Sequence, residues 1–221
     1  MMDLIQESIK DLKLFNAKKR SKHIEKLLDY YNGNDTKQYI SNMFSGEAFR
    51  EIPPVETNIT RKFINKMSRI YTIGANRNVN DKYDELTTLK SARMKHIERM
   101  TRLCGTIATR VVWNEGETPY YDYRPVYYFH VFFEDDPFVP SALTYPILQP
   151  VEDSSKTENL TYAYWDAEKY ILTEENGKVI DERLHNYGIL PFVFTHRENQ
   201  TDSFYVEGAN DIINANEHVN I

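Results

Sequence analysis

The spacing of apolar residues changes near Leu103, and this change constrains the fold more than any other feature. Before Leu103 they recur three and four positions apart, as in amphipathic helices; after Gly105 the pattern is that of strands, rich in β-formers. A chain with helices first and strands afterwards predicts an α+β fold, with N-terminal helices packed on a mainly antiparallel sheet. The predicted regions are a helical one at 1–104, a β-rich one at 105–207, and the start of a further helix at 208–221.

Length and composition exclude several classes of protein. The 221 residues suffice for one large domain or two small ones. No apolar run approaches the length of a membrane-spanning helix, and the N-terminus lacks the apolar core of a secretory signal. A single cysteine, Cys104, rules out an internal disulfide and a cysteine-based zinc cluster, and it favours a cytosolic protein. The net charge of −6 disfavours a chain that coats nucleic acid, although local basic patches are compatible with it.

The clearest predicted helix covers residues 56–71, where Thr57 or Asn58 supplies an N-cap. Its apolar positions predict a stripe that faces the core: Ile59, Phe63, Met67, Ile70 and Tyr71. Its opposite face is basic, with Arg61, Lys62, Lys66 and Arg69. A second helix is predicted over 81–103, with Ile97, Met100 and Leu103 inward.

Strands are predicted from residue 106 onward. The segments are 106–113, 120–124, 126–133, 160–165, 169–173, 178–184 and 191–196. Asn176-Gly177 predicts a tight turn, because both residues tolerate a positive φ. The prolines at 137, 140 and 146 interrupt the pattern between residues 133 and 160, where strand boundaries are least defined.

Residues with catalytic or metal-binding chemistry form no recognised motif. His130 precedes Glu134, Asp135 and Asp136, but no histidine pair has the HExxH spacing or another known ligand spacing. The sequence has no GxSxG, SxxK, GxGxxG or Walker A motif. Cys104 is best explained as a small buried thiol. The sequence therefore predicts no enzyme and no cofactor; a metal-dependent hydrolase around His130 and Asp135 is the weakest alternative.

Two basic clusters have two interpretations. One comprises Lys18, Lys19, Arg20 and Lys22; the other comprises Arg61, Lys62, Lys66 and Arg69. Such clusters can contact phosphates, and a nucleic-acid-binding module is the alternative function that they suggest. They can equally be the solvated faces of two helices.

Tyrosine is abundant in the β-rich half, where six of the ten residues at 120–129 carry large rings. A strand with rings on both faces is either buried within its own domain or covered by a neighbouring subunit. The composition does not separate these two cases, but it is the one feature that points from residue chemistry toward an assembly.

Four segments, in order, resemble the N-terminal part of tailed-bacteriophage portal proteins. Residues 56–71 are similar to a portal helix of pattern N-x-x-R-K-hydrophobic-hydrophobic-(D/N)-K, followed by Y-x-x-G at 71–74. The passage around 104–108 resembles the portal transition from a long helix into a strand. Residues 186–193 are similar to the portal segment NPYG-x-(I/L)-P-(F/V)-V but lack its proline before Tyr187. Residues 202–220 resemble the segment F-x-G-x-x-D-(L/I) that begins a further helix.

This resemblance covers about 30–221 and implies a structural portal subunit, the head–tail connector of a virion. The β-rich region would be the wing, and 208–221 would begin a helix leading to a stem outside this chain. The implied partners are further copies in a ring (usually a dozen), the major capsid protein, the terminase motor, a head–tail adaptor and the double-stranded DNA that passes through, with no membrane. The implied location is the portal vertex of the capsid, after synthesis in the host cytoplasm.

Overall fold

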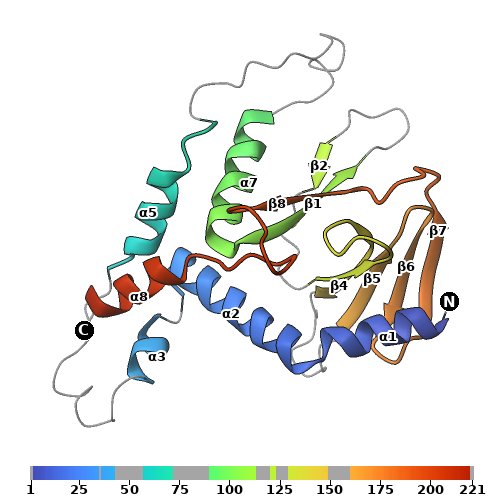
Figure 1. Cartoon of the computed structure of the whole chain (residues 1–221). Helices are drawn as coiled ribbons and strands as arrows, with labels where there is room; N and C mark the ends of the chain where they lie inside the picture. The colour runs from blue at the N-terminus through green and yellow to red at the C-terminus, as the bar shows by residue number, and fades with distance from the viewer. Residues whose placement is uncertain are drawn as a thin grey trace. The chain divides into compact units, whose positions relative to one another are not determined.

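The structure is a computed structural model of the chain, and it describes residues 2–34, 36–42, 57–71, 90–112, 120–122, 129–148 and 160–219 (Figure 1). The chain divides into two compact units, each built from two segments. Unit 1 contains Met1–Lys22 and Val126–Val193, and unit 2 contains His23–Pro125 and Phe194–Ile221. The described helices and antiparallel strands confirm the predicted α+β class.

Unit 1 is a five-stranded antiparallel sheet with a helix across one face (Figure 1). The strands are β3 (His130–Phe133), β4 (Pro140–Leu148), β5 (Leu160–Trp165), β6 (Lys169–Glu174) and β7 (Val179–Leu184). Each strand pairs with its neighbour in the sequence, in the order β3-β4-β5-β6-β7. The strand predictions for 160–165, 169–173 and 178–184 are confirmed within one residue at each end.

Helix α1 (Met2–Leu12) covers this sheet because its apolar residues lie on one side. Ile5 and Ile9 are each 3% exposed and form a core cluster with Tyr162 and Ile171. The β6–β7 turn comes close to the same helix: a side chain at Gly177, whose φ is 87°, would meet the Gln6 side chain. The Asn-Gly turn predicted at 176–177 is confirmed by this positive φ.

The opposite face of the sheet is closed by aromatic rings. The ring of Trp165 lies 5.9 Å from that of Phe192, and Tyr145 lies 6.3 Å from Phe192, both nearly perpendicular. Phe192 is the first residue of β8 (Phe192–His196), so this strand begins in unit 1 and continues into unit 2. The rings explain why β5 is buried on both faces.

Strand β4 differs from the sequence prediction, which treated its prolines as interruptions. It is nine residues long and pairs with β5 through Pro146, which lies opposite Tyr162. Its pairing with β3 extends only from Pro140 to Thr144 among the described residues. A proline is tolerated where a strand has a neighbour on one side only, since one side then needs no N–H donor.

Unit 2 is mainly helical. It contains the rest of α2 (Phe15–Asn32) from His23 onward, α3 (Thr36–Ser41), α5 (Ile59–Met67), α7 (Lys90–Cys104) and α8 (Asn210–Val219). A three-stranded sheet joins β1 (Thr106–Val112) to β2 (Tyr120–Asp122) on one side and to β8 on the other. The predicted inward residues of α7 are buried: Ile97, Met100 and Leu103.

Two glycines bring distant segments of unit 2 into backbone contact. Gly105, at the α7–β1 junction, has a φ of 86°, and a side chain there would collide with the backbone of Val206 and Glu207. A side chain at Gly208 would collide with the Leu103 carbonyl. The space is used by hydrogen bonds from Ala209 N–H to the Leu103 carbonyl (2.9 Å) and from Val206 N–H to Thr106 Oγ1 (2.8 Å).

Helix gives way to strand at Gly105, since α7 ends at Cys104 and β1 begins at Thr106. The compact units divide elsewhere, because α1 packs on the β3–β7 sheet while α8 packs on α5.

Candidate functional site

Helix α5 exposes both apolar and basic side chains. It begins where the sequence predicts, because the Asn58 side chain accepts the N–H of Arg61 at 3.0 Å. It ends at Met67, and the Ser68 hydroxyl donates to the Ile64 carbonyl at 2.8 Å. The helix is therefore shorter than the predicted 56–71, and Gly74, which the sequence predicts to stop the helix, lies outside the described residues.

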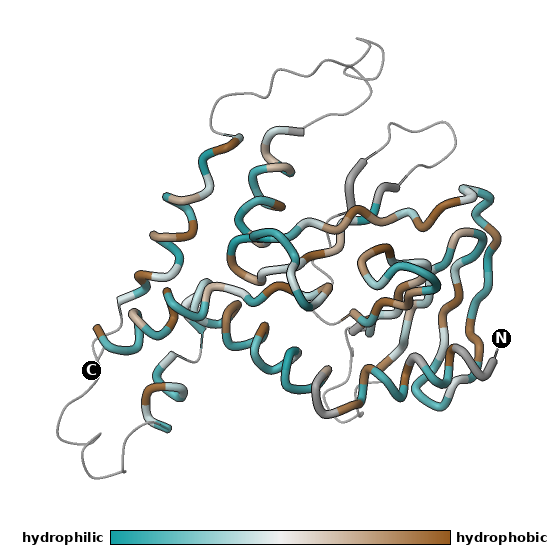
Figure 2. The backbone as a smooth tube through the Cα atoms, in the orientation of Figure 1, coloured by the Kyte–Doolittle hydropathy of each residue, from teal (hydrophilic) through white to brown (hydrophobic). Residues whose placement is uncertain are grey.

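The predicted inward stripe of α5 is wrong. Phe63, Met67 and Ile70 are 51%, 41% and 68% exposed, whereas Thr60, Ile64 and Ser68 are buried. Figure 2 shows hydrophobic and hydrophilic residues mixed along this helix. The buried face of the helix is the neighbouring one, which contains Thr60 and Ile64.

Polar contacts explain this choice of face. The Ile59 N–H donates to Asn216 Oδ1 of α8 at 3.4 Å, and the Ile70 N–H donates to Glu98 Oε1 of α7 at 3.4 Å. The first bond reaches the N-terminal end of α5, where helices leave N–H donors without an intrahelical partner, and the second holds the turn that follows the helix C-terminus. They orient the helix with its small residues and Ile64 toward α7 and α8, and the larger apolar residues stay outside.

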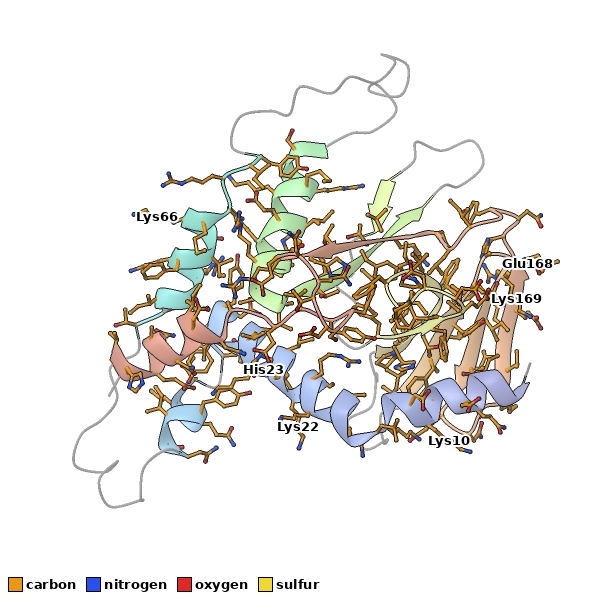
Figure 3. All side chains as sticks on the ribbon, viewed as in Figure 1. Lys10, Lys22, His23, Lys66, Glu168 and Lys169 are labelled. Atoms are coloured by element: carbon orange, nitrogen blue, oxygen red, sulfur yellow. The ribbon has the colours of Figure 1, made fainter. Side chains whose placement is uncertain are left out.

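The four predicted basic residues, three on α5 and Arg69 just after it, are all exposed. Two of them, Arg61 and Arg69, make contacts of their own. The Arg61 guanidinium lies 5.7 Å from the centre of the Tyr31 ring, and Arg69 donates to the Lys66 carbonyl at 2.8 Å. Lys66 extends away from α7 in Figure 3. It lies three residues from Phe63 and four from Ile70, so Lys62 and Lys66 flank the exposed apolar stripe.

The other predicted basic cluster lies on α2 in unit 1. Lys18, Lys19 and Lys22 are exposed, and Figure 3 shows Lys22 on the outer side of the helix. Arg20 has a structural contact, since its guanidinium donates to the Phe129 carbonyl at 3.1 Å. The two basic clusters therefore belong to different units. In the α2 cluster, Arg20 is bonded to the backbone just before β3.

A buried charge network at the α2–α8 contact was not predicted. Glu217 is 4% exposed, yet it accepts the Tyr30 hydroxyl at 2.8 Å and pairs with Lys26 at 2.6 Å. Burial and this carboxylate raise the pKa of Tyr30 well above its usual value. Lys26 also lies 5.7 Å from the centres of the Tyr30 and Tyr39 rings. No local motif marks such a network, because Glu217 lies 187 residues from Tyr30.

The histidine and acidic residues at 130–136 are placed as predicted, a strand followed by an exposed turn. His130 Nε2 lies 3.5 Å from Asp11, and burial lowers the pKa of His130 while the Asp11 carboxylate opposes that shift. In the part of the chain that the structure describes, no three His, Cys, Asp or Glu side chains are grouped to hold a metal.

Cys104 is buried at the end of α7, as predicted. Burial raises the pKa of its thiol to about 12, so the thiol stays protonated near neutral pH. This environment is that of a structural residue, not of a nucleophile.

The tyrosine-rich run at 120–129 lies largely outside the described residues. Only the backbone of β2 and the buried Phe129 are described, so the choice between internal burial and subunit burial stays a prediction. Among the described helices, none has the length and apolar character needed to cross a bilayer. No protein-family profile matches the chain, and no curated protein matches it.

Proposed function

We propose that the chain is a structural subunit of a portal-type ring, with no catalytic role of its own. The proposal rests on the resemblance of four ordered segments to tailed-bacteriophage portal proteins. In this role the subunit joins copies of itself around a DNA channel at a capsid vertex. The other proposed partners are the capsid protein, the terminase motor and the head–tail adaptor.

The observation that carries the proposal is the convergence of three of these segments in unit 2. Residues 56–71, 104–108 and 202–220 are far apart in sequence, yet α5 packs on α8 through Asn216, and the Val206 N–H donates to Thr106 Oγ1. The three segments therefore form one packed substructure of unit 2, as a resemblance to a single portal region requires. Their contact supports the interpretation that they belong to one inherited substructure.

The fourth segment has a local physical explanation that suits the same interpretation. Asn186 has a φ of 52° and Gly188 a φ of 68°, just before β8 begins. Only glycine and asparagine adopt this left-handed conformation readily. The residue types that resemble the portal segment are therefore those that the bend into β8 requires.

Charge also supports the proposal. A channel through which DNA slides must not hold phosphates, and like charges repel. The chain carries a net charge of −6. This favours a ring that DNA passes through over a module that grips nucleic acid.

Native mass spectrometry of the protein purified from its natural source tests the proposal. A closed ring of about a dozen copies, seen also in negative-stain images, is the expected result. A monomer or dimer at micromolar concentration would contradict it. Salt-sensitive binding of duplex DNA that is lost on changing Lys18, Lys19, Lys62 and Lys66 would favour the nucleic-acid-binding alternative instead.

A further inference from the structure

Two exposed patches on the chain each combine apolar side chains with charged ones; the charged residues are basic in one patch and acidic in the other. The first, which we call the α5 stripe, consists of Phe63, Met67 and Ile70 with the exposed Lys62 and Lys66 beside them. The second, the acidic turn, joins β3 to β4 and is made of Glu134, Asp135, Asp136, Phe138 and Val139. The α5 stripe belongs to unit 2 and the acidic turn to unit 1.

The α5 stripe has the composition of an interface centre. Phe63, Met67 and Ile70 are between 41% and 68% exposed; Phe63 and Met67 lie one turn apart on α5, and Ile70 lies in the turn that follows the helix. Aromatic residues and methionine are enriched where proteins bind one another, and charged residues are placed at the rim. The two lysines supply such a rim on one side.

The acidic turn is small but held in one shape. Phe138 N–H donates to Asp136 Oδ1 at 2.8 Å, and Val139 N–H donates to the Asp136 carbonyl at 3.1 Å. These bonds present Phe138, 40% exposed, and Val139, 61% exposed, next to the carboxylates of Glu134 and Asp135. A surface fixed before binding loses less conformational entropy when it binds.

We infer that the α5 stripe of one copy binds the acidic turn of a second copy. The apolar residues of each patch cover those of the other, while Lys62 and Lys66 face Glu134 and Asp135. One patch is basic and the other acidic, which is the charge complementarity expected of specific partners. The inference rests on the proposed function in taking the partner to be another copy of this chain.

This contact has a consequence for symmetry. Two different patches make a head-to-tail contact, and such contacts produce rings when the rotation closes and filaments when it does not. A two-fold dimer, by contrast, would pair one patch with itself. The inference therefore predicts how copies join, and not only that they join.

Apolar substitutions test the head-to-tail geometry. One full-length variant carries F63S and M67S, and the other carries F138S and V139S; circular dichroism checks that each is folded. In sedimentation velocity each variant alone should associate at least about tenfold more weakly than the unchanged chain. Mixed together, they retain one intact stripe and one intact turn, so a one-to-one dimer and nothing larger is expected. A mixture that stays monomeric overturns the inference.

Charge exchange provides a second, independent test. K62E/K66E should weaken association, and E134K/D135K added in the same chain should restore it. The matched control is K18E/K19E, which makes the same charge change on exposed lysines of α2 and should leave association unchanged. An effect of the control equal to that of K62E/K66E would overturn the inference, as would failure of the combined variant to recover.

The outcomes separate this inference from the proposed function. Rings that form equally well with the F63S/M67S variant overturn the inference and leave the ring function standing. Association through the two patches that yields only filaments supports the inference and contradicts the portal proposal. Binding of the unchanged chain to anionic phospholipid vesicles, lost in K62E/K66E without any change in association, would assign the α5 stripe to a membrane surface and overturn the inference.

Discussion

Helices α1 and α5 both carry an apolar stripe, and the two stripes have opposite fates. On α1, Ile5 and Ile9 are each 3% exposed because the β3–β7 sheet covers them. On α5, Phe63 and Ile70 are 51% and 68% exposed, and the buried face is the one that contains Ile64.

The difference shows that periodicity locates a stripe but not what covers it. α1 meets a sheet whose face is apolar along β5 and β6. Burial of its apolar stripe is therefore the largest contribution to the free energy that holds α1 in place. α5 meets two helices that offer Asn216 and Glu98 to its ends, and these polar contacts select the face with small residues. An exposed apolar stripe on such a helix is a surface available to a partner.

The largest effects should follow from emptying the buried anchor of each helix. Ile9→Ala and Ile64→Ala should each lower the free energy of unfolding by about 2–5 kcal/mol, because each removes buried methyl groups and leaves a cavity. Urea denaturation measures the loss, and hydrogen-exchange mass spectrometry shows which unit loses protection. If Ile64→Ala cost as little as a surface change, α5 would not be held by its Ile64 face.

A smaller loss is expected from Glu217→Gln, at the contact that places α8 against α2. The amide cannot pair with Lys26 as a carboxylate does, although it can still accept the Tyr30 hydroxyl. A hydrogen-bonded charged group contributes about 1.5–3 kcal/mol, and that is the expected decrease in the free energy of unfolding. Glu25→Gln, the same change at an exposed position of α2, is the matched control and should be nearly neutral.

Acidification should distinguish the two units. Burial lowers the pKa of His23, His96 and His196 in unit 2 below 6.5, so the unfolded state binds protons more readily than the folded state. Stability is therefore present above pH 6.5 and is lost as the pH falls below it. In unit 1, burial lowers the pKa of His130 in the same direction, and Asp11 partly opposes that shift, as Glu207 does for His23 in unit 2.

Hydrogen exchange measured at pH 7.5 and 5.5, after correction for intrinsic rates, checks this difference. Protection should fall more in α7 than in α1. Equal loss of protection in both helices would contradict it.

The smallest effect on stability is expected from Phe63→Ser, in contrast to Ile64→Ala one position away. Because Phe63 is 51% exposed, its replacement should change the free energy of unfolding by no more than about 0.5 kcal/mol. Urea denaturation at a concentration where the chain is monomeric measures this. A loss comparable to that of Ile64→Ala would mean that the stripe is part of the core after all.

Local features of the fold could be predicted from the sequence because their causes are local. The Asn58 cap, the Asn176-Gly177 turn and the β5 and β6 strands follow from residue types at neighbouring positions. Strand β4 could not be predicted in this way, because Pro146 is acceptable only when the pairing around it is known. The covering of α1 by a sheet more than 100 residues away is likewise a tertiary event.

The candidate site was predicted in part. Its basic residues on α5 were identified, but the apolar residues beside them were assigned to the core. That error arose because a helix with two possible inner faces gives no local sign of which one is used, and the deciding groups, Glu98 and Asn216, lie on other helices. Glu217 was missed for a similar reason, since its partner Tyr30 lies at the other end of the chain.

The interleaving of the two units has a consequence for synthesis on the ribosome. Unit 1 is complete once Val193 has been made, although its first segment was made before most of unit 2. The junction around Gly105 must wait for residues 194–209, which include the segment that Gly208 allows to approach Leu103. Because β1 ends at Val112, this wait spans the synthesis of residues 113–209, which takes roughly five to twenty seconds at ordinary elongation rates. During that interval α7 and β1 are present without their C-terminal partner, so nascent unit 2 is the part most in need of a chaperone.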